Sequence, residues 1–447
     1  MAKYKAYPEY KDSGVEWLGE IPIHWKMLRH KYVAFFTKGK NPTNLLEQPL
    51  KNTLPYLSME CLRNNTTDKY ALISNDVRVA LEGQPLIIWD GSNAGEFVKG
   101  KSGILSSTMA AATLTYPLYS QYYWYLCISI EPEMRKNAVG MGIPHVNGDE
   151  LKSISFGIPS IYEQKQVAEF LDHETAKIDN LIEKQQQLIE LLKEKRQAVI
   201  SHAVTKGLNP DVPMKDSGVE WLGEVPEHWC INSLNHVLAA IGDVDHYMPQ
   251  SVDDGIPYVM TGDLTEFASG IEFSKCKQVN LRDYLKLSKK IKTCLGDVIM
   301  ARYATIGTVS YVDIDSDFLV SYSCVTIKPN PSKVLGLYLY YYFKSNSFLQ
   351  GIQYQVNTNT QGNVGINDLS KMKIVLPSIK EQEEIIAHLQ MNLEQLVDLS
   401  TKSTQAINLI QERRTALISA AVTGKIDVRD WVAPDTQDVE EPQEATA

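Results

Sequence analysis

The sequence predicts a mixed α/β protein in which two separate modules are joined by two long antiparallel helices, with an internal pseudo-two-fold repeat. Two observations predict this fold class. The segment KDSGVEWLGEIPIHW at 11–25 returns as KDSGVEWLGEVPEHW at 215–229, with 13 of 15 positions identical. A second pair, IPSIYEQKQVAEFL from Ile158 and LPSIKEQEEIIAHL from Leu376, opens two long segments of helical periodicity. A constant frame around two different inserts is expected to present two modules in equivalent positions.

The repeat divides the chain into seven parts. The parts are an N-terminal repeated segment (1–25), a first insert (26–157), a central long helix (158–208), a linker with the second repeated segment (209–229), a second insert (230–375), a C-terminal long helix (376–426) and an acidic tail (427–447). The tail is rich in proline, glutamine and acidic residues, so we expect it to be disordered.

The long helices show apolar residues at alternating spacings of four and three, with polar breaks that fall at matching positions. A helix of about 40 residues is about 60 Å long, enough to hold two modules apart. Because both helices lie in one chain, we favour intramolecular antiparallel pairing over a coiled coil between two chains. The predicted seam consists of Thr175, Ile178, Ile182, Gln185, Ile189, Leu192, Arg196 and Val199, and of Leu389, Leu393, Leu396, Ser400, Ser403, Ile407, Ile410, Arg414 and Leu417.

Each long helix is expected to end at a glycine, since SHAVTKGL at 201–208 resembles SAAVTGKI at 419–426. The tryptophans of the repeated segments offer two interpretations, stacking on bases or packing against the helices. We favour packing because they belong to the constant frame. These tryptophans are Trp17, Trp25, Trp221 and Trp229.

Both inserts predict short strands, turns rich in Gly, Ser, Asn or Thr, and a tyrosine-rich helix. The helices are LYSQYYWYLCIS at 118–129 and LGLYLYYYFKSNSFL at 335–349. The tyrosines of the second helix could stack on bases, but so apolar a helix more often fills a core. They are Tyr338, Tyr340, Tyr341 and Tyr342.

Composition is that of a globular chain of 447 residues, and no apolar run approaches the ~20 residues of a membrane span. We therefore expect a cytoplasmic protein that does not contact a membrane. The formal net charge of -10 is unevenly placed, because the first insert has 14 Lys and Arg against 11 Asp and Glu while the tail is strongly acidic. If the chain binds DNA, partner subunits are expected to supply much of the phosphate neutralisation.

The cysteines are scattered singly, without a CxxC pair or neighbouring histidines. We expect free, buried thiols and neither a metal site nor a disulfide. They are Cys61, Cys127, Cys230, Cys276, Cys294 and Cys324.

The repeated SGVEWLGE segment and the PSIxEQ helix entry, placed around two inserts, resemble the specificity subunits of type I restriction-modification systems. The resemblance covers nearly the whole chain. It implies that each insert is a target recognition domain that reads one half of a bipartite, asymmetric sequence in double-stranded DNA. Equivalent modules on one duplex should contact half-sites about one helical turn, ~34 Å, apart.

The resemblance also implies partners and cofactors outside this chain. Two modification subunits would use S-adenosylmethionine to methylate adenine by base flipping. Two restriction subunits would use ATP and magnesium for translocation and cleavage. We expect no cofactor, metal or catalytic residue in this chain itself.

Base reading requires donors and acceptors on polar loops. Each candidate could also be a solvated surface residue or a phosphate contact, and the NTNTQGN run at 357–363 is the strongest set. In the first insert the candidates are Arg63, Asn64, Asn65, Ser92, Asn93, Lys99, Lys101, His145 and Asn147. In the second insert they are Lys289, Lys290, Lys292, Arg302, Tyr303, Thr305, Asn357, Thr358, Asn359, Gln361 and Asn363.

Two other functions remain open. GEFVKGKS at 95–102 matches the P-loop pattern, in which Lys101 would bind phosphates. A working P-loop opens a helix, whereas this motif is followed by Gly103 and ILSSTM, so a turn between strands explains it better. The second alternative is a coiled-coil scaffold that does not bind DNA.

Overall fold

The computed structural model describes residues 4–64, 66–138, 143–355 and 362–433. The chain divides into two compact units, unit 1 from 1–184 together with 406–447, and unit 2 from 185–405. Each unit contains one insert, called module 1 (26–157) and module 2 (230–375) below. Within the described residues, no helix combines the length and the apolar composition needed to cross a bilayer.

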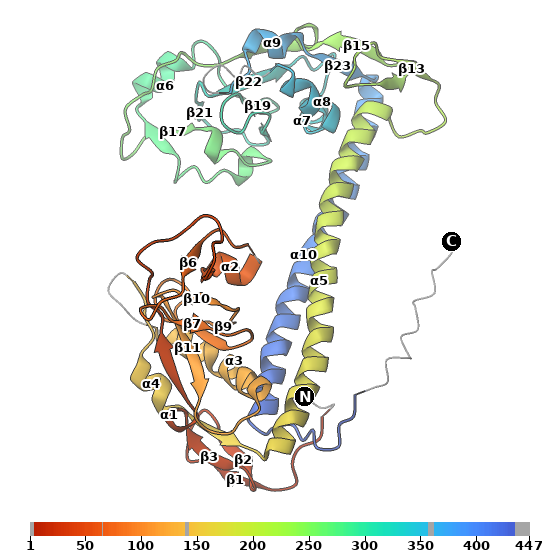
Figure 1. Ribbon diagram of the computed structural model, residues 1–447. Helices are drawn as coiled ribbons and strands as arrows, with labels where there is room; N and C mark the ends of the chain where they lie inside the picture. Colours follow the sequence, from red (N-terminus) through yellow and green to blue (C-terminus); the bar gives the residue numbers. More distant parts are fainter. Residues whose placement is uncertain (1–3, 65, 139–142, 356–361, 434–447) are drawn as a thin grey trace. The chain divides into compact units, whose positions relative to one another are not determined.

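Unit 1 begins with the first repeated segment and continues into module 1 (Figure 1). Its elements before the long helix are β1 (Tyr10–Asp12), β2 (Glu20–Pro22), β3 (Lys26–Arg29), α1 (His30–Val33), β4 (Ala34–Lys38), β5 (Thr53–Leu57), α2 (Met59–Asn64), β6 (Tyr70–Leu72), β7 (Val79–Ala80), β8 (Pro85–Ile88), β9 (Phe97–Lys99), β10 (Gly103–Leu105), β11 (Met109–Leu114), α3 (Ser120–Lys136), α4 (Gly148–Ser153) and β12 (Ser155–Ile158). The long helix α5 (Ile161–Lys206) starts in unit 1 and ends in unit 2.

Unit 2 contains the second repeated segment and module 2. Its elements are β13 (Met214–Asp216), β14 (Glu224–Pro226), β15 (Cys230–Ser233), η1 (Leu234–His236), β16 (Leu238–Gly242), β17 (Ile256–Val259), η2 (Thr261–Asp263), η3 (Ala268–Gly270), β18 (Lys277–Val279), α6 (Leu281–Leu287), β19 (Val298–Ala301), β20 (Val309–Tyr311), β21 (Leu319–Val320), β22 (Cys324–Pro329), α7 (Gly336–Phe343), α8 (Asn346–Gln353), α9 (Ile366–Lys371) and β23 (Lys373–Leu376). The second long helix α10 (Ile379–Val422) starts in unit 2 and ends in unit 1.

The two modules share one topology although their sequences differ. The main sheet is antiparallel, in the order β4-β11-β8-β9 in module 1 and β16-β22-β19-β20 in module 2. A second sheet contains one parallel pair in each module, β5 with β10 and β17 with β21. The ends of each module are also paired, since Lys26 lies opposite Ile158 and Cys230 opposite Leu376. The mixed α/β prediction is confirmed.

The central strands β8 and β19 are buried along their whole length, because both faces of the main sheet are covered. Side chains alternate between the faces. In module 1, Ile87 packs in the core that includes α3, while Leu86 and Ile88 pack in the core that includes the second sheet. Module 2 repeats this, with Met300 facing α7 and Ile299 facing the second sheet.

The tyrosine-rich helix α7 belongs to the core, as predicted. Its tyrosines are at most 4% exposed. The Tyr338 hydroxyl donates to the Val375 carbonyl at 3.1 Å, and the Tyr342 hydroxyl donates to the Lys373 carbonyl at 2.8 Å. These side chains hold the last strand of the module and are not available to stack on bases.

The long helices are 46 and 44 residues long, and they pack antiparallel within each unit, as predicted. Every predicted seam residue is buried or half-buried. In unit 1, Arg414 near the end of α10 binds Asp179 near the start of α5, with Nε to Oδ1 at 2.8 Å. The matching polar position of α5, Arg196, instead binds Glu266 of module 2 at 2.7 Å. The matched arginines of the seam, Arg196 and Arg414, therefore both form ion pairs.

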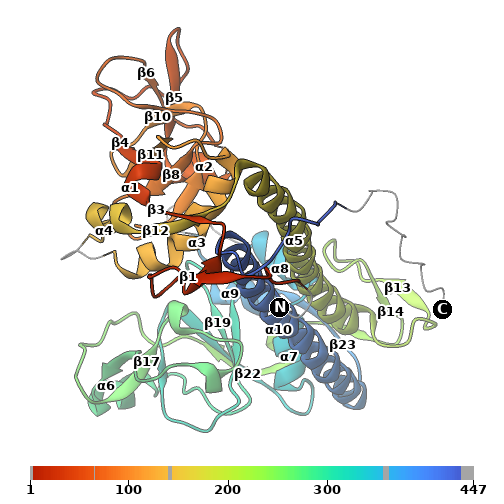
Figure 2. The same cartoon turned by 90° about the horizontal axis from the view of Figure 1, so that it is seen from below.

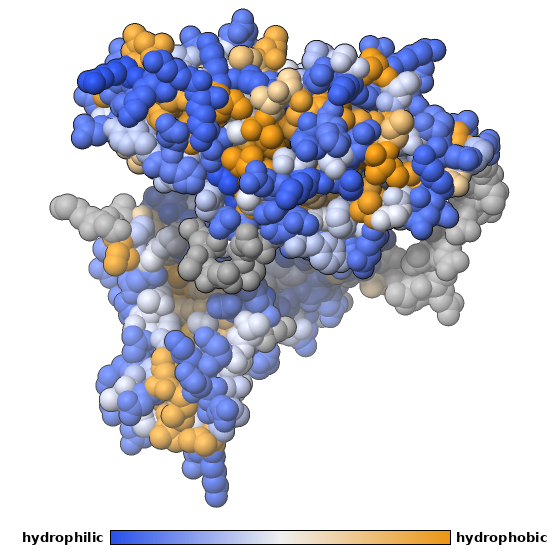
Figure 3. Space-filling model, turned by 90° about the horizontal axis from the view of Figure 1, so that it is seen from above, coloured by the Kyte–Doolittle hydropathy of each residue, from blue (hydrophilic) through white to orange (hydrophobic). Residues whose placement is uncertain are grey.

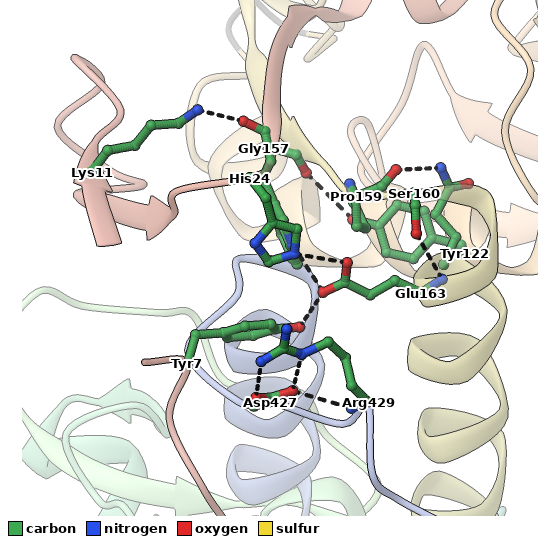
Figure 4. A network of polar contacts seen from close by, with 12 residues as sticks. Tyr7, Lys11, His24, Tyr122, Gly157, Pro159, Ser160, Glu163, Asp427 and Arg429 are labelled. Atoms are coloured by element: carbon green, nitrogen blue, oxygen red, sulfur yellow. Dashed lines mark hydrogen bonds and ion pairs between the residues drawn. The ribbon is translucent and has the colours of Figure 1, made fainter. Parts of the chain in front are cut away.

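A glutamate in the first turn of each long helix holds the repeated segment, and Figure 4 shows the contacts of the first one, Glu163. The carboxylate of Glu163, which is 3% exposed, accepts hydrogen bonds from the Trp25 indole at 3.0 Å and the Tyr7 hydroxyl at 2.6 Å. His24 Nε2 lies 3.0 Å from its other oxygen. Ser160 caps the helix by accepting from the Glu163 N–H. In a capping box this glutamate would reach back to the cap residue, whereas here it is directed to the repeated segment.

The second repeat forms the same contact with fewer partners. Glu381 accepts from the Trp229 indole at 3.0 Å and lies 3.2 Å from His228 Nε2. The position of Tyr7 is taken by Asp211, which cannot donate when ionised. Trp25 and Trp229 are buried, so packing is confirmed for both, while Trp17 is 45% exposed.

The glutamine that follows each glutamate holds the insert. The buried Gln164 side chain accepts from the Tyr119 N–H at the start of α3, at 2.9 Å, and donates to the Pro159 carbonyl. Gln382 accepts from the Leu335 N–H at the start of α7, also at 2.9 Å. The Glu-Gln pair in each PSIxEQ motif thus joins the long helix to both the repeated segment and the insert.

Each repeated segment also holds the end of the other long helix. The predicted glycine ends are confirmed, with φ of 80° at Gly207 and 75° at Gly424. A side chain at Gly424 would meet the Pro22 ring at 2.3 Å. The Tyr10 hydroxyl donates to the Gly424 carbonyl, and Figure 2 shows β1 beside this end of α10. In unit 2, Lys206 donates to the Glu224 carbonyl.

The prediction of a disordered tail was wrong for its first residues. The Asp427 N–H donates to the Lys5 carbonyl at 2.8 Å, Arg429 pairs with Asp427, and Trp431 packs edge-on against Phe170. The contact of Asp427 forms because the N-terminal segment lies beside the end of α10, and that of Trp431 forms with α5. Residues 434–447 lie outside the described residues.

The cysteine prediction was wrong at two positions. All six thiols are free, but Cys230 and Cys294 are exposed while the other four are buried. Burial raises the pKa of the Cys324 thiol to about 12.

Figure 3 shows that hydrophilic side chains cover most of one face of unit 2, with apolar side chains gathered in smaller patches.

We predict that Glu163→Ala destabilises the protein more than Glu381→Ala. The first change leaves two buried donors without a partner and should cost about 2 to 4 kcal/mol, whereas the second should cost about 1 to 2 kcal/mol. Urea denaturation followed by tryptophan fluorescence measures both losses. Glu190→Ala, on an exposed face of α5, is the control and should change little. Equal losses for both variants would contradict the prediction.

Candidate nucleic-acid interface

Two loops of module 1 that are far apart in sequence lie side by side at one edge of the main sheet. The first loop, 89–96, follows β8, and the second, 143–147, leads into α4. An isolated antiparallel bridge joins Asp90 to His145. The candidates Ser92, Asn93, His145 and Asn147, predicted from two separate loops, therefore belong to one surface.

Module 2 places two loops in the same way. The loop 302–308 follows β19, and the segment 362–365 leads into α9. An isolated antiparallel bridge joins Tyr303 to Asn363. The candidates Tyr303, Thr305 and Asn363 are thus brought together at the edge that corresponds to that of module 1.

The third residue after the central strand has a positive φ in both modules. It is Gly91 in module 1, with φ of 110°, and Ala304 in module 2, with φ of 56°. A residue with a Cβ pays about 1 to 2 kcal/mol in this conformation. The surrounding contacts of module 2 must therefore hold this turn in place.

The structure corrects the prediction that Arg302 contacts DNA, because its side chain is buried and cannot reach a groove. The residue is 5% exposed, and its Nη2 lies 2.6 Å from Asp243. The guanidinium also donates to the carbonyls of Val364 and Tyr322, at 3.1 Å each. Arg302 thus holds the two loops together from inside the module.

Asp243 collects three cationic or titratable partners. Besides Arg302, its carboxylate lies 3.0 Å from Lys290 Nζ and 3.1 Å from His246 Nε2. Burial alone would raise the pKa of Asp243, but the hydrogen bonds from Lys290 and His246 and the charge of Arg302 lower it below its usual range. The candidate Lys290 is thereby connected, through Asp243, to Arg302 at the start of the loop 302–308.

In module 1 the edge is extended by α2. Arg63 Nη2 lies 2.6 and 2.7 Å from the two carboxylate oxygens of Glu96, at the end of the loop that follows β8. Arg135 of α3 binds the same carboxylate at 3.4 Å. The exposed Asn64 follows Arg63 on α2. Both candidates therefore lie next to the loop pair.

Two further lysine candidates are exposed and have partners. Lys99 donates to the Gln121 side chain at 3.2 Å and lies over the Trp124 ring. Lys292 lies 2.8 Å from Asp317, and hydrogen bonds to Asp317 and Tyr284 raise its pKa. The exposed ion pair of Lys292 contributes little to stability, so a phosphate can compete for this lysine, and Lys99 has only neutral partners among the described residues.

Of the other loop candidates, apart from Lys101 in the P-loop motif, one is described and five are not. Lys289 is exposed just beyond α6. Five others lie outside the described residues, namely Asn65, Asn357, Thr358, Asn359 and Gln361.

The P-loop motif does not have the geometry that phosphate binding requires. It contains β9 and the turn before β10, so the motif is followed by a strand and not by a helix. Lys101 Nζ donates to the Cys61 carbonyl at 2.7 Å. Among the described residues, no group of three or more His, Cys, Asp or Glu could hold a metal ion.

Sequence reasoning missed the residues that position the loops. Lys38, at the end of β4, lies 2.6 Å from Asp90, and Asp243, just after β16, pairs with Arg302. The one available signal was a charged residue directly after an apolar strand. That signal is common, and the pairing depends on strand order, which the sequence does not state.

A family model described as the Type I restriction modification DNA specificity domain matches residues 22–191 and again residues 246–409. The two matches cover most of both modules and together more than half of the chain. The chain belongs to this family. The predicted resemblance is therefore confirmed.

Two similar proteins are named as specificity subunits of type I restriction enzymes, and each match covers most of both chains. The specificity subunit of type I restriction enzyme MjaVIII from Methanocaldococcus jannaschii is 26% identical over 416 residues, which cover 92% of this chain and 95% of that protein. The EcoBI specificity subunit from Escherichia coli is 20% identical over 442 residues, covering 93% and 89%.

Two solved structures share the fold of this specificity-domain protein. A chain from a study of complex assembly and conformational transition of the type I R-M system has a TM-score of 0.64 at 14% identity, covering 91% of this chain and 99% of that chain. The HsdS subunit from Thermoanaerobacter tengcongensis has a TM-score of 0.50 at 14% identity, covering 93% and 100%.

Behind the interface, a buried histidine supports α4. His30 on α1 has Nδ1 3.1 Å from the Leu151 carbonyl of α4 and Nε2 2.8 Å from the Tyr123 hydroxyl of α3. Burial lowers the pKa of His30 to about 4, although the hydrogen bond to Leu151 acts in the opposite direction.

We predict that His30 makes unit 1 sensitive to mild acid. Its lowered pKa favours the neutral form in the folded state, so its contribution is complete above the unfolded pKa of about 6.5 and is lost as pH falls toward 4, by up to about 3 kcal/mol. Urea denaturation across this range should show a steeper loss of stability for the wild type than for His30→Gln. Parallel pH profiles would contradict the prediction.

Proposed function

We propose that this protein is the DNA-reading subunit of a type I restriction-modification complex, and that each module reads one half of an asymmetric, bipartite target. One observation carries the proposal. Two modules of the same topology present the same pair of bridged loops at the same edge, but with different side chains. A shared scaffold with different donors and acceptors is suited to reading two different sequences.

The chemistry of the loops supports two different half-sites. Module 1 presents a hydroxyl, an amide and an imidazole at Ser92, Asn93 and His145. Module 2 presents a phenol and an amide at Tyr303 and Asn363. Asparagine can bind adenine through two hydrogen bonds in the major groove, and the other groups donate or accept singly. On a continuous duplex the half-sites would lie about one helical turn, ~34 Å, apart.

The same proposal assigns the chemistry to partner subunits. Two modification subunits would dock on the two equivalent frames and methylate adenine with S-adenosylmethionine, and two restriction subunits would use ATP and magnesium. Support comes from the duplicated joint at Glu163 and Glu381, which offers two related frames to identical partners. The specificity subunit itself would be non-catalytic.

The other readings have less support. A nucleotide-binding role would need Lys101 at a helix N-terminus, and Lys101 lies in a strand-turn-strand segment. A scaffold that does not bind DNA leaves the paired polar loops of both modules without a use.

The first experiment maps methylation in cells. The protein is co-expressed with its modification subunit in a host without adenine methylation, and modified adenines are located by long-read sequencing. We expect one split, asymmetric motif. A palindromic motif would contradict the assignment of one half-site to each module. A soluble complex without any motif would favour the scaffold function.

We predict that Asn93→Ala changes only one half of that motif. Losing a bidentate contact should reduce discrimination at one base pair about 5- to 100-fold, while the other half stays intact. This variant also shows which half belongs to module 1. Lys31→Ala, an exposed lysine before the opposite end of β4, is the control. Relaxation of both halves, or of neither, would remove Asn93 from the interface.

A further inference from the structure

The two modules close the same edge of the main sheet with ion pairs of opposite polarity. In each module, the first and third strands of the sheet run in the same direction, because both are antiparallel to the strand between them. Their last residues therefore meet at one edge, on either side of the start of that middle strand. In module 1 the pair is Lys38, the last residue of β4, with Asp90 after β8, and in module 2 it is Asp243 after β16 with Arg302 after β19.

The pairs differ in burial. Lys38 and Asp90 have side chains 46% and 31% exposed, whereas Asp243 and Arg302 are each 6% exposed. An exposed pair contributes little, while a buried charge that loses its partner is costly. The pair of module 2 is therefore the one that fixes local geometry.

Arg302 contacts the residue after β16, the residue before β22 and the segment 362–365. Its side chain binds Asp243 and the Val364 carbonyl, and its backbone N–H donates to the Ser323 carbonyl at 3.0 Å. Its backbone carbonyl accepts from the Val364 N–H at 3.2 Å. Arg302 and Val364 are thus joined through both backbone and side chain, one residue away from the Tyr303–Asn363 bridge on each strand.

The turn that follows Arg302 needs this support. Ala304 has the unfavourable positive φ, and the exposed Thr305 is the next residue. Module 1 has Gly91 at the corresponding position, which adopts a positive φ without strain. A rigid anchor before the turn compensates for the missing glycine in module 2.

We propose that Arg302 is a positioning residue for half-site recognition by module 2: it holds the turn 303–307 against the segment 362–365 without contacting DNA. This proposal rests on the DNA-reading function proposed above. Removal of the guanidinium should leave the module folded but let the two loops move independently, which relaxes the reading of one half-site.

Arg302→Met tests the proposal with the whole complex. Methionine fills a similar apolar volume, and Asp243 keeps Lys290 and His246 as partners. Methylation at sites mismatched in the module 2 half should rise at least about tenfold relative to wild type, since one mismatch normally costs roughly 5- to 150-fold. The module 1 half should be read unchanged, which also reports that the complex is assembled.

The chain offers a matched control at the opposite edge of the same sheet. Lys328 Nζ lies 2.6 Å from Asp297, a buried carboxylate that also accepts from the Cys294 N–H. Lys328→Met removes the cation from a buried carboxylate in the same sheet, but away from the loops. It should leave both halves of the motif unchanged. Equal relaxation by Lys328→Met would mean that general stability, and not loop position, controls recognition, and would overturn the proposal.

Arg302→Lys keeps the test decisive if the methionine variant loses all methylation. Lysine retains the charge for Asp243 but lacks the fork that reaches both carbonyls. We expect an intermediate relaxation of the module 2 half alone. Wild-type discrimination in Arg302→Lys, or in a folded Arg302→Met, would overturn the role of Arg302. Absence of any bipartite motif in the wild type would instead contradict the proposed function.

Discussion

The hydrogen bond between a helix-start glutamate and a frame tryptophan is the contact on which both halves of this protein depend. Glu163 and Glu381 each bind an indole N–H at 3.0 Å, and the neighbouring glutamine binds the first turn of the insert helix. A carboxylate accepts such bonds strongly when it is shielded from water. One dipeptide therefore fixes the long helix, the repeated segment and the module relative to one another within each unit, and this explains why it is present in both repeats.

This arrangement lets the inserts vary while the frame stays constant. Each module begins and ends on a pair of hydrogen-bonded strands, β3 with β12 and β15 with β23. Because both ends leave at one place, the frame needs only that strand pair and the start of one helix. Between those points the two modules keep a common topology with different side chains, and the difference extends to opposite polarity in the ion pair that closes the loop edge.

Features that repeat regularly along the chain could be predicted from the sequence. The seam of α5 and α10, the terminal glycines Gly207 and Gly424 and the buried tyrosines of α7 all follow from local pattern, since spacing and burial are linked in helices. The candidate interface was predictable only as separate polar loops. That Asp90 lies beside His145, or that Arg302 is buried against Asp243, depends on strand order and long-range closure. The same limit explains the error at 427–433, because acidic composition favoured disorder while the partner of Asp427 was the N-terminal Lys5.

The contact between Lys5 and Asp427 affects the order in which the two units can be completed during synthesis. Unit 2 is one continuous stretch, 185–405, and its repeated segment follows α5 through a covalent linker. Unit 1 contains the first residues of the chain but also the last turns of α10. During synthesis, unit 1 therefore cannot be completed until the end of α10 has been made. Unit 2 has all of its residues earlier, once residue 405 has been made. A growing polypeptide would therefore complete unit 2 before the end of α10 could complete unit 1.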